Sequence, residues 1–484
     1  MSQKLGRALC AGALVVGLAG CAVKAPRLPG DAARMIGMGD SIGEGVQSAD
    51  ASLRTQPFSY LKFLARQIRV PFSLPLIKSG PLGEVGDTSN RSRLIPSLAA
   101  SNLAVAGSDV ESLLNDRADA ITEDDIDSER DLVLFPRRAS QIEIAESVAA
   151  PFIVCWIGGG NVLPAVASFD ELDASQLTPV QEFSADFAQI VQRLNALDSP
   201  VIFANILDVT QIGFLVDRQD LVKFLGSDFG LAEGDLTSVV VMLLIRLGLD
   251  DGSLLNDPNF VLDANEVTLI QQRIEVFNRI IEDAVTPLGI PVVDVKAMFD
   301  AIAADPPVFR DVALTPRFLG GLSSLDGVHP SNIGHAFLAN AFIETINAHF
   351  QTDIPPISKK GLKFIFLTDP FVDKDGDGRV PGRFGAGLLE TLGPILGISG
   401  DFDDFIPDPF RAGIDESLGI PITDEGLGIQ FIQRYLILQG KDPQEASKWD
   451  KKDVMEAFRH ILGLKIFEKA PTGRTGGRSR GWPR

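Results

Sequence analysis

A serine, a histidine and an aspartate in this chain are of the types and spacing that nucleophilic catalysis needs. The chain has four histidines, and only His329 has a carboxylate, that of Asp326, three residues before it. A carboxylate at that spacing can hold the imidazole in one tautomer and stabilise its charged form. Such a base can take the proton of Ser41, which follows a short apolar run at residues 35–38, as the hydroxyl attacks a carbonyl. The chemistry predicted is acyl transfer through an acyl-serine.

The surroundings of Ser41 fit two serine-hydrolase patterns. Residues 39–43 read Gly-Asp-Ser-Ile-Gly, which matches the G-x-S-x-G turn of the α/β-hydrolases. That fold needs several strands before its nucleophile, whereas Ser41 lies only 20 residues after Cys21. A serine directly after the first strand favours a different fold. This segment alone also fits a serine that only caps the following helix.

Three further segments follow in the order that the different fold requires. Residues 102–107 read NLAVAG, residues 156–161 read WIGGGN, and residues 324–330 read SLDGVHP. Together with the Gly-Asp-Ser turn, these segments resemble the motifs of the GDSL, or SGNH, hydrolases. The resemblance implies a flavodoxin-like three-layer α/β sandwich with a parallel sheet. It also implies that Ser41 is the nucleophile, His329 the base and Asp326 its partner, with no cofactor needed for catalysis.

The same resemblance implies an oxyanion hole, the group of donors that binds the negative oxygen of the intermediate. Its donors would be the backbone N–H groups of Ser41 and Gly107 and the side-chain amide of Asn161. Loss of one such donor costs roughly 100- to 1000-fold in turnover in comparable sites. One residue departs from the family pattern, because Val162 follows Asn161 where aspartate is common.

Apolar runs alternate with helical patterns, which predicts a parallel sheet covered by helices on both faces. The runs occupy residues 35–38, 103–106, 152–157, 201–204 and 290–295. The best-defined helix begins at Asp263, which forms a capping-box pattern with Glu266. A second, less regular helix is expected at residues 138–148.

Composition divides the chain into several parts. We expect a signal peptide at 1–20, a tether at 21–33, the hydrolase domain at 34–355 with a helical insertion at about 207–262, a mainly helical module at 358–470 and a disordered basic tail at 471–484. Within the insertion, residues 239–249 are apolar nearly all round. They form either a core helix or the wall of an apolar cleft, and base rates favour the core helix.

The N-terminal segment resembles the signal of a bacterial lipoprotein. Lys4 and Arg7 precede an apolar run at residues 8–20, which is shorter than the ~20 residues that span a bilayer. Small residues then lead to Cys21, and the resemblance implies cleavage before this cysteine and lipid attachment to it. The expected location is the bacterial cell envelope, at the outer membrane or its periplasmic face; an ordinary secretory signal is the alternative. Three cysteines cannot form a disulfide framework, and Cys155 is expected to be buried and inert.

A loop near the C-terminal third has part of a calcium-binding pattern. Asp373, Asp375 and Asp377 place carboxylates at alternate positions, where they can converge on one cation. Phe384 stands at the twelfth position in place of the bidentate glutamate, so a complete EF-hand is excluded. The sequence leaves open a partial structural calcium site, completed by a residue such as Glu390, or a plain polar turn.

Charge and aromatic content bear on partners. The formal net charge of −20 would repel phosphate backbones, which argues against nucleic acid as a partner. With 30 Phe against 3 Trp and 2 Tyr, the chain has few of the amphipathic rings that suit sugars, which favours acyl or lipid esters as substrates. A deacetylase or acyltransferase of envelope polysaccharide and a non-catalytic binding lipoprotein remain as alternatives. The membrane would be a partner through the N-terminal lipid.

Overall fold

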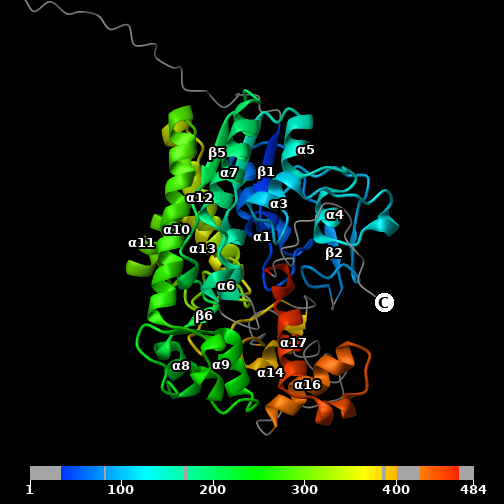
Figure 1. Cartoon of the computed structure of the whole chain (residues 1–484), viewed down its shortest axis with the longest axis vertical. Coiled ribbons are helices and arrows are strands. Elements are labelled where there is room, and N and C mark those ends of the chain that lie inside the picture. Colours follow the sequence, from blue (N-terminus) through cyan, green and yellow to red (C-terminus); the bar gives the residue numbers. More distant parts are fainter. Residues whose placement is uncertain (1–33, 81–82, 168–172, 384–387, 401–425, 468–484) are drawn as a thin grey trace, which may run out of the picture.

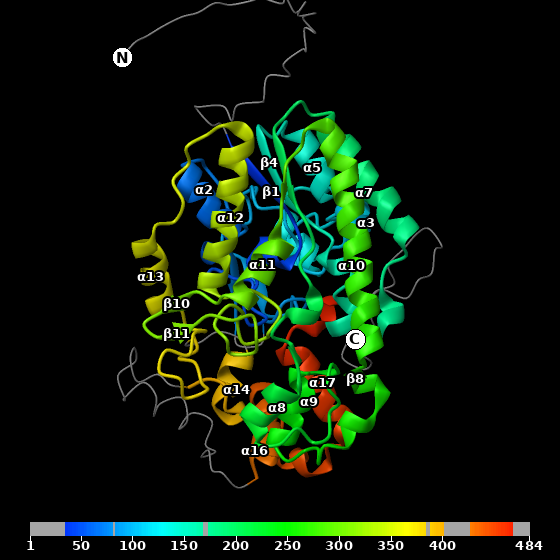
Figure 2. The same ribbon diagram turned by 90° about the vertical axis from the view of Figure 1, so that its left-hand side faces the viewer.

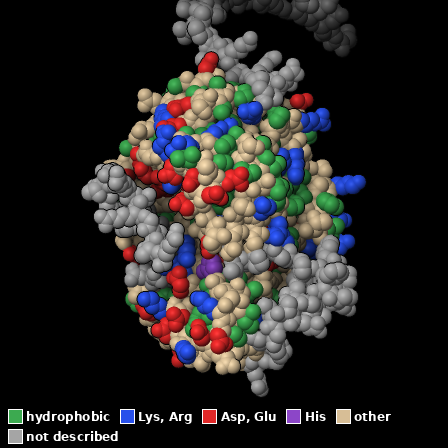
Figure 3. Space-filling view, turned by 90° about the vertical axis from the view of Figure 1, so that its right-hand side faces the viewer, with side chains coloured by type: hydrophobic (Ala, Val, Ile, Leu, Met, Phe, Trp, Pro, Cys, Tyr) green, Lys and Arg blue, Asp and Glu red, His purple; other side chains and the backbone are tan. Residues whose placement is uncertain are grey.

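The computed structural model describes residues 34–80, 83–167, 173–383, 388–400 and 426–467. The expected signal peptide, Cys21, the tether and the basic tail lie outside these residues, so lipid attachment stays a prediction. Within the described ranges, no helix combines the length and the apolar character that a membrane crossing requires. Acidic and basic side chains are interspersed over one face of the molecule, and histidine atoms are visible at the waist between its larger and smaller parts (Figure 3).

A parallel sheet forms the centre of the larger part (Figure 1). Its strands pair in the order β1 (Met35–Gly39), β4 (Phe152–Trp156), β5 (Val201–Ala204) and β9 (Val292–Val293). The predicted run at 103–106 extends the sheet beyond β1 through a short ladder, in which the N–H groups of Leu103 and Val105 donate to the carbonyls of Gly37 and Gly39. This order, with the second segment on the outer side of the first, is the flavodoxin-like one. The predicted fold class is confirmed.

Helices cover both faces of the sheet (Figure 2). One layer contains α3 (Val110–Asn115), α5 (Gln141–Ser147), α7 (Val180–Asn195) and α10 (Ala264–Val285), and the other contains α2 (Tyr60–Ile68) and α12 (Asn332–Phe350). Along β4 the side chains alternate between the two cores: Ile153 and Cys155 face the first layer, whereas Val154 and Trp156 face the second. Burial raises the pKa of the Cys155 thiol, as expected for an inert core residue.

Two helices lie where local sequence signals predicted them, and one strand is shorter than predicted. The Asp263 side chain accepts hydrogen bonds at the start of α10, and Glu266 completes the capping box. The less regular helix is α5, which begins at Gln141 after the cap residue Ser140. The last predicted strand, at 290–295, is reduced to β9 because Asp294 caps a helix, α11 (Val295–Ala304), that begins there.

The insertion is not purely helical, and that expectation is wrong. It contains a small antiparallel sheet of β6 (Leu215–Val216), β7 (Leu236–Ser238) and β8 (Val261–Leu262), besides α8 (Arg218–Leu225) and α9 (Val239–Arg246). Strands of two or three residues are too short to show a two-residue period. The apolar segment is α9, which is buried from Val239 to Leu244 and acts as a core helix.

The C-terminal third is mainly helical where it is described. It contains α13 (Lys359–Thr368), α14 (Leu388–Leu396), α16 (Leu427–Leu438), α17 (Lys451–Ile461) and a final 3₁₀ turn, η11 (Leu464–Phe467). Gly428 of α16 packs against Leu247 and Leu249, which directly follow α9. Helix α17 rises from the lower part of the molecule towards α1 (Ser41–Glu44) (Figure 1).

Candidate active site

Ser41 lies at the turn between β1 and the short helix α1 (Ser41–Glu44). Asp40 caps this helix, and its carboxylate accepts a hydrogen bond of 3.0 Å from the N–H of Ile42. Gly39 has a φ of +146°, and a Cβ at this position would lie 2.1 Å from the carbonyl oxygen of Trp156. Only glycine therefore fits before Asp40, and the turn places Ser41 at the carboxyl end of the sheet.

Asp326 and His329 form a buried pair on one turn. His329 Nδ1 and Asp326 Oδ2 are 2.8 Å apart, and the two residues are 2% exposed or less. Asp326 also accepts hydrogen bonds from the backbone N–H groups of Val328 and His329, at 2.9 Å each, and of Ala49, at 3.0 Å. Burial alone would raise the pKa of Asp326, but the charge of His329 and these donors hold it below its ordinary value. Asp326 is therefore an ionised acceptor for the Nδ1 hydrogen, which leaves the Nε2 lone pair to act as a base.

Ser41 lies near this pair, without a hydrogen bond from its hydroxyl to His329 Nε2 in the described structure. Ser41 and Val328, the residue before His329, line the same pocket. The charge of His329 also acts on Asp40, the residue before Ser41, whose pKa burial raises to about 6. His329 Nε2 is buried and has no hydrogen-bond partner in the described part of the chain. Catalytic hydrogen bonds in structures without substrate are often loose and tighten only when substrate binds.

The two other predicted oxyanion donors follow the next two sheet segments. Gly107, with a φ of +82°, ends the ladder beside β1, and Asn161 is fully buried in the turn after β4. The side chain of Asn161 is fixed at both ends: its Oδ1 accepts from the N–H of Val110 at 3.2 Å, and its Nδ2 donates to Thr178 Oγ1 at 3.1 Å. An amide nitrogen carries a second hydrogen, which is the one expected to serve the oxyanion. With both ends held in this way, the departure at Val162 leaves the Asn161 amide oriented.

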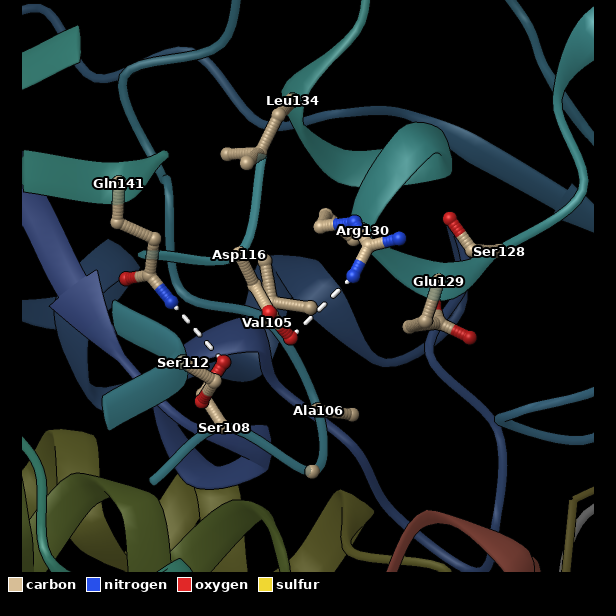
Figure 4. Close-up of a pocket in the computed structure, with 11 residues that line it drawn as sticks. Val105, Ala106, Ser108, Ser112, Asp116, Ser128, Glu129, Arg130, Leu134 and Gln141 are labelled. Carbon is tan, nitrogen blue, oxygen red and sulfur yellow. Dashed lines mark hydrogen bonds and ion pairs between the residues drawn. The ribbon is translucent and has the colours of Figure 1, made fainter. Parts of the chain in front are cut away.

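Two residues that the sequence analysis missed join these segments. Gln141 accepts from the N–H of Gly39 at 2.9 Å and donates to the Gly39 carbonyl at 2.9 Å and to Ser108 Oγ at 3.1 Å (Figure 4). Buried Glu44 accepts from the N–H of Ala106 at 2.7 Å. They tie the nucleophile turn to the residues on either side of Gly107. The local sequence does not predict either contact. The only hint is that a glutamine, Gln141, lies on the buried face of α5.

Two pockets adjoin these segments and differ in character. The one that Ser41 lines is apolar and about 20 Å³, roughly the room of one water molecule. Its walls include Ile42, Trp156, Leu163, Ile206, Val209 and Ile212. The other pocket, about 180 Å³, lies between Gly107, α3 and α4 (Glu129–Leu134), and polar side chains such as the Arg130–Asp116 ion pair border it (Figure 4).

The expected calcium loop has its carboxylates close together. Oxygen atoms of Asp373, Asp375 and Asp377 lie within 4.8 Å of one another. Both oxygens of Asp373 accept backbone N–H groups of the loop itself, from Gly376 at 2.7 Å and Gly378 at 2.9 Å. Glu390 accepts instead from the N–H of Arg383. The arrangement fits a polar turn as well as a cation site, and calcium stays a prediction.

Fold and site together define a class. The chain has a flavodoxin-like α/β fold, in which the serine follows the first strand, the glycine and asparagine follow the next two sheet segments, and aspartate and histidine share a late turn. These are the positions that the sequence motifs predicted.

Comparisons with known proteins found likenesses at the level of structure. LAE5, an alpha/beta hydrolase from the metagenome of Lake Arreo, is 13% identical, with a TM-score of 0.33 over 64% of this chain and 94% of that one. Axe2, an acetylxylan esterase from Geobacillus stearothermophilus, is 15% identical, with a TM-score of 0.32 over 66% and 95%. A candidate SGNH hydrolase from Slackia heliotrinireducens is 16% identical, with a TM-score of 0.30 over 65% and 100%. No protein-family model and no curated protein sequence matches the chain.

Proposed function

We propose that this chain is a serine esterase that hydrolyses a carboxylic ester through an acyl-Ser41 intermediate. The observation that supports this most is the buried pair of Asp326 and His329, 2.8 Å apart, whose Nε2 has no hydrogen-bond partner among the described residues. An imidazole held at Nδ1 by a carboxylate keeps the Nε2 lone pair available as a general base. Removal of the Ser41 proton would use that lone pair.

The reaction would run in two halves. Ser41 Oγ attacks the ester carbonyl carbon while His329 Nε2 takes the hydroxyl proton, and the negative carbonyl oxygen is bound by the N–H groups of Ser41 and Gly107 and the Asn161 amide. The intermediate then expels the alcohol, which receives the proton from His329. In the second half, water attacks the acyl-serine with His329 again as base. The acid is released and Ser41 regains its proton.

The acyl group is proposed to be short. The apolar pocket beside Ser41 is about 20 Å³ and is walled by core side chains such as Trp156 and Ile206, so it accepts an acetyl methyl group without repacking. A long acyl chain would need that core to open. Short-chain esters are therefore a better proposal than the lipid esters that the phenylalanine content favoured.

A fluorophosphonate probe tests the function directly. We expect it to label the wild-type chain and to leave Ser41→Ala unlabelled, because the probe reacts only with an activated serine. Ser59→Ala, a buried serine whose Oγ accepts from the N–H of Lys62 at the start of α2, is the matched control and should still be labelled. Equal labelling of Ser41→Ala and wild type would refute the assignment. With p-nitrophenyl esters, acetate should be hydrolysed faster than octanoate, and the reverse order would contradict the short acyl group.

A further inference from the structure

The last described turn of the chain, η11 (Leu464–Phe467), lies across the candidate active site. The ring of Phe467 faces the imidazole of His329, with ring centres 6.2 Å apart and planes inclined by 19°. The carbonyl oxygen of Ile466 lies 2.7 Å from the place that a Cβ on Gly107 would occupy. A segment from the far end of the chain thus contacts two groups with predicted catalytic roles.

The same turn closes an apolar surface beside these groups. Ile466 packs on a cluster formed by Val46, Val85 and Ala106, together with Ala51. Phe467 is 4% exposed, and Ser41 and His329 are 2% exposed each. The space that remains beside Ser41 is the apolar pocket of about 20 Å³. An acyl methyl group fits there, but the alcohol part of an ester would meet Ile466 or Phe467.

We propose that Leu464–Phe467 is a self-inhibitory strap that fills the alcohol side of the active site and must leave before an ester binds. The inference rests on the proposed esterase function. It also gives the chemistry of the covered subsite: an isoleucine and a phenylalanine occupy it, against valine and alanine side chains. An aryl or alkyl alcohol therefore fits it better than a sugar, whose hydroxyl groups would find no partners on that apolar wall.

The connection to α17 gives the strap a place to bend. Gly463, with a φ of +64°, separates α17 from the strap and packs against Ala49. The side chains of Ile466 and Phe467 meet the site through apolar contacts, which an apolar ligand can replace, whereas the Ile466 carbonyl oxygen lies against Gly107. Rotation at Gly463 would lift both side chains together.

A disulfide that locks the strap is the first experiment. A Cβ on Gly86 would lie 3.0 Å from Ile466 Cγ2, which puts the two Cβ atoms roughly 4 Å apart, within the usual disulfide range of about 3.5–4.5 Å. In the full chain with Gly86→Cys and Ile466→Cys, oxidation should slow fluorophosphonate labelling of Ser41 by about tenfold or more, because the open state is removed. Reduction should restore the rate, so the reduced protein is its own control. Equal rates in the two redox states would overturn the strap.

Shortening Phe467 is the second experiment. Phe467→Ala should label several times faster than wild type, and its kcat/KM should rise more for phenyl acetate than for a monoacetylated glucoside. Phe364→Ala, on α13 at a residue that is 67% exposed, is the matched control and should label at the wild-type rate. Unchanged or slower labelling of a Phe467→Ala protein that keeps its circular dichroism would refute the proposal. Failure of the esterase function would look different, because labelling would then not depend on Ser41 at all.

Discussion

His329 is held in different ways on its two sides. On one side its Nδ1 pairs with Asp326, whose carboxylate also accepts from three backbone N–H groups, and all of these contacts are directional and buried. On the other side the ring of Phe467 lies beside the imidazole in an offset apolar contact. Hydrogen bonds fix an angle and a distance, whereas an apolar contact requires only that some apolar group be present. The side that hydrogen bonds hold performs the chemistry, whereas the side that the apolar contact holds can be displaced by a bound substrate.

The two sides of the proposed ester site differ in the same way. The acyl side is walled by Trp156, Leu163 and Ile206, which belong to the packed cores around the sheet and cannot move without repacking. The alcohol side is walled by the strap, which arrives from the end of the chain. Acyl selectivity should therefore be fixed by the fold, whereas alcohol selectivity should depend on one short segment.

The largest effect is expected from breaking the directional side. Asp326→Asn puts an amide where the carboxylate accepts the Nδ1 hydrogen and the N–H of Ala49, so the imidazole loses its tautomer. We expect kcat to fall by about 10⁴-fold, as for comparable triads. Asp40→Asn is the matched control, because an asparagine oxygen still accepts from the N–H of Ile42 and caps α1. Similar losses of kcat in the two variants would argue against a special role for Asp326.

A smaller loss is expected at the oxyanion donor. Asn161→Ala removes the amide donor and also the acceptor that holds the N–H of Val110, whereas Asn161→Asp keeps that acceptor but puts a buried carboxyl oxygen in place of the donor. Turnover should fall about 100- to 1000-fold in both variants. Both variants should lose thermal stability: the alanine variant by the cost of an unpaired buried N–H, about 1–3 kcal/mol, and the aspartate variant by the cost of burying a carboxyl group. Thermal unfolding and initial rates on phenyl acetate measure the two effects. Near-normal kcat in Asn161→Asp would mean that Asn161 only anchors α3.

Sequence reasoning reached the features that have a local signal. The capping box of Asp263 and Glu266 located α10, and β5 has the predicted bounds of 201–204 because a buried strand reads as a continuous apolar run. The motif residues could be predicted to lie at one end of the sheet, because in this fold class the carboxyl ends of the parallel strands lie at the same edge.

The remaining features depend on contacts between distant residues. Gln141 looks like any polar residue of an amphipathic helix, and only its contacts with Gly39 and Ser108 give it a role. Residues 464–467 read as an ordinary apolar turn, and nothing local indicates that they lie on His329. Only their position in the folded chain distinguishes these residues from others of the same type, and sequence periodicity does not encode that position.

Helix α17, from which the strap extends, is held in part by a polar contact of His460, whose imidazole titrates. On α17, His460 Nε2 lies 3.3 Å from Glu84 and 3.6 Å from Asp87, both in the segment between β2 (Ile77–Ser79) and β3 (Arg91–Arg93). The other polar groups around the imidazole are Tyr435, Gln439 and Lys465. Burial alone would lower the pKa of His460, but the two carboxylates outweigh it and raise the pKa to about 9 from 6.5. The imidazole of His460, 3.6 Å away, in turn holds the pKa of Asp87 below its ordinary value.

The sign of the pH effect follows from the raised pKa. Protonated His460 stabilises the contact of α17 with Glu84 and Asp87 fully below pH 6.5, and this stabilisation is lost as the pH rises through about 9. Because the strap extends from α17, it is then held less firmly. The labelling rate of wild type, divided by that of Phe467→Ala to remove the pH dependence of the chemistry itself, should therefore rise about two- to fivefold between pH 7 and pH 10, the size of a modest ion pair. In His460→Gln the ratio should be flat and already high at pH 7. A ratio that stays constant in wild type would show that the apolar contacts of Ile466 and Phe467 hold the strap alone.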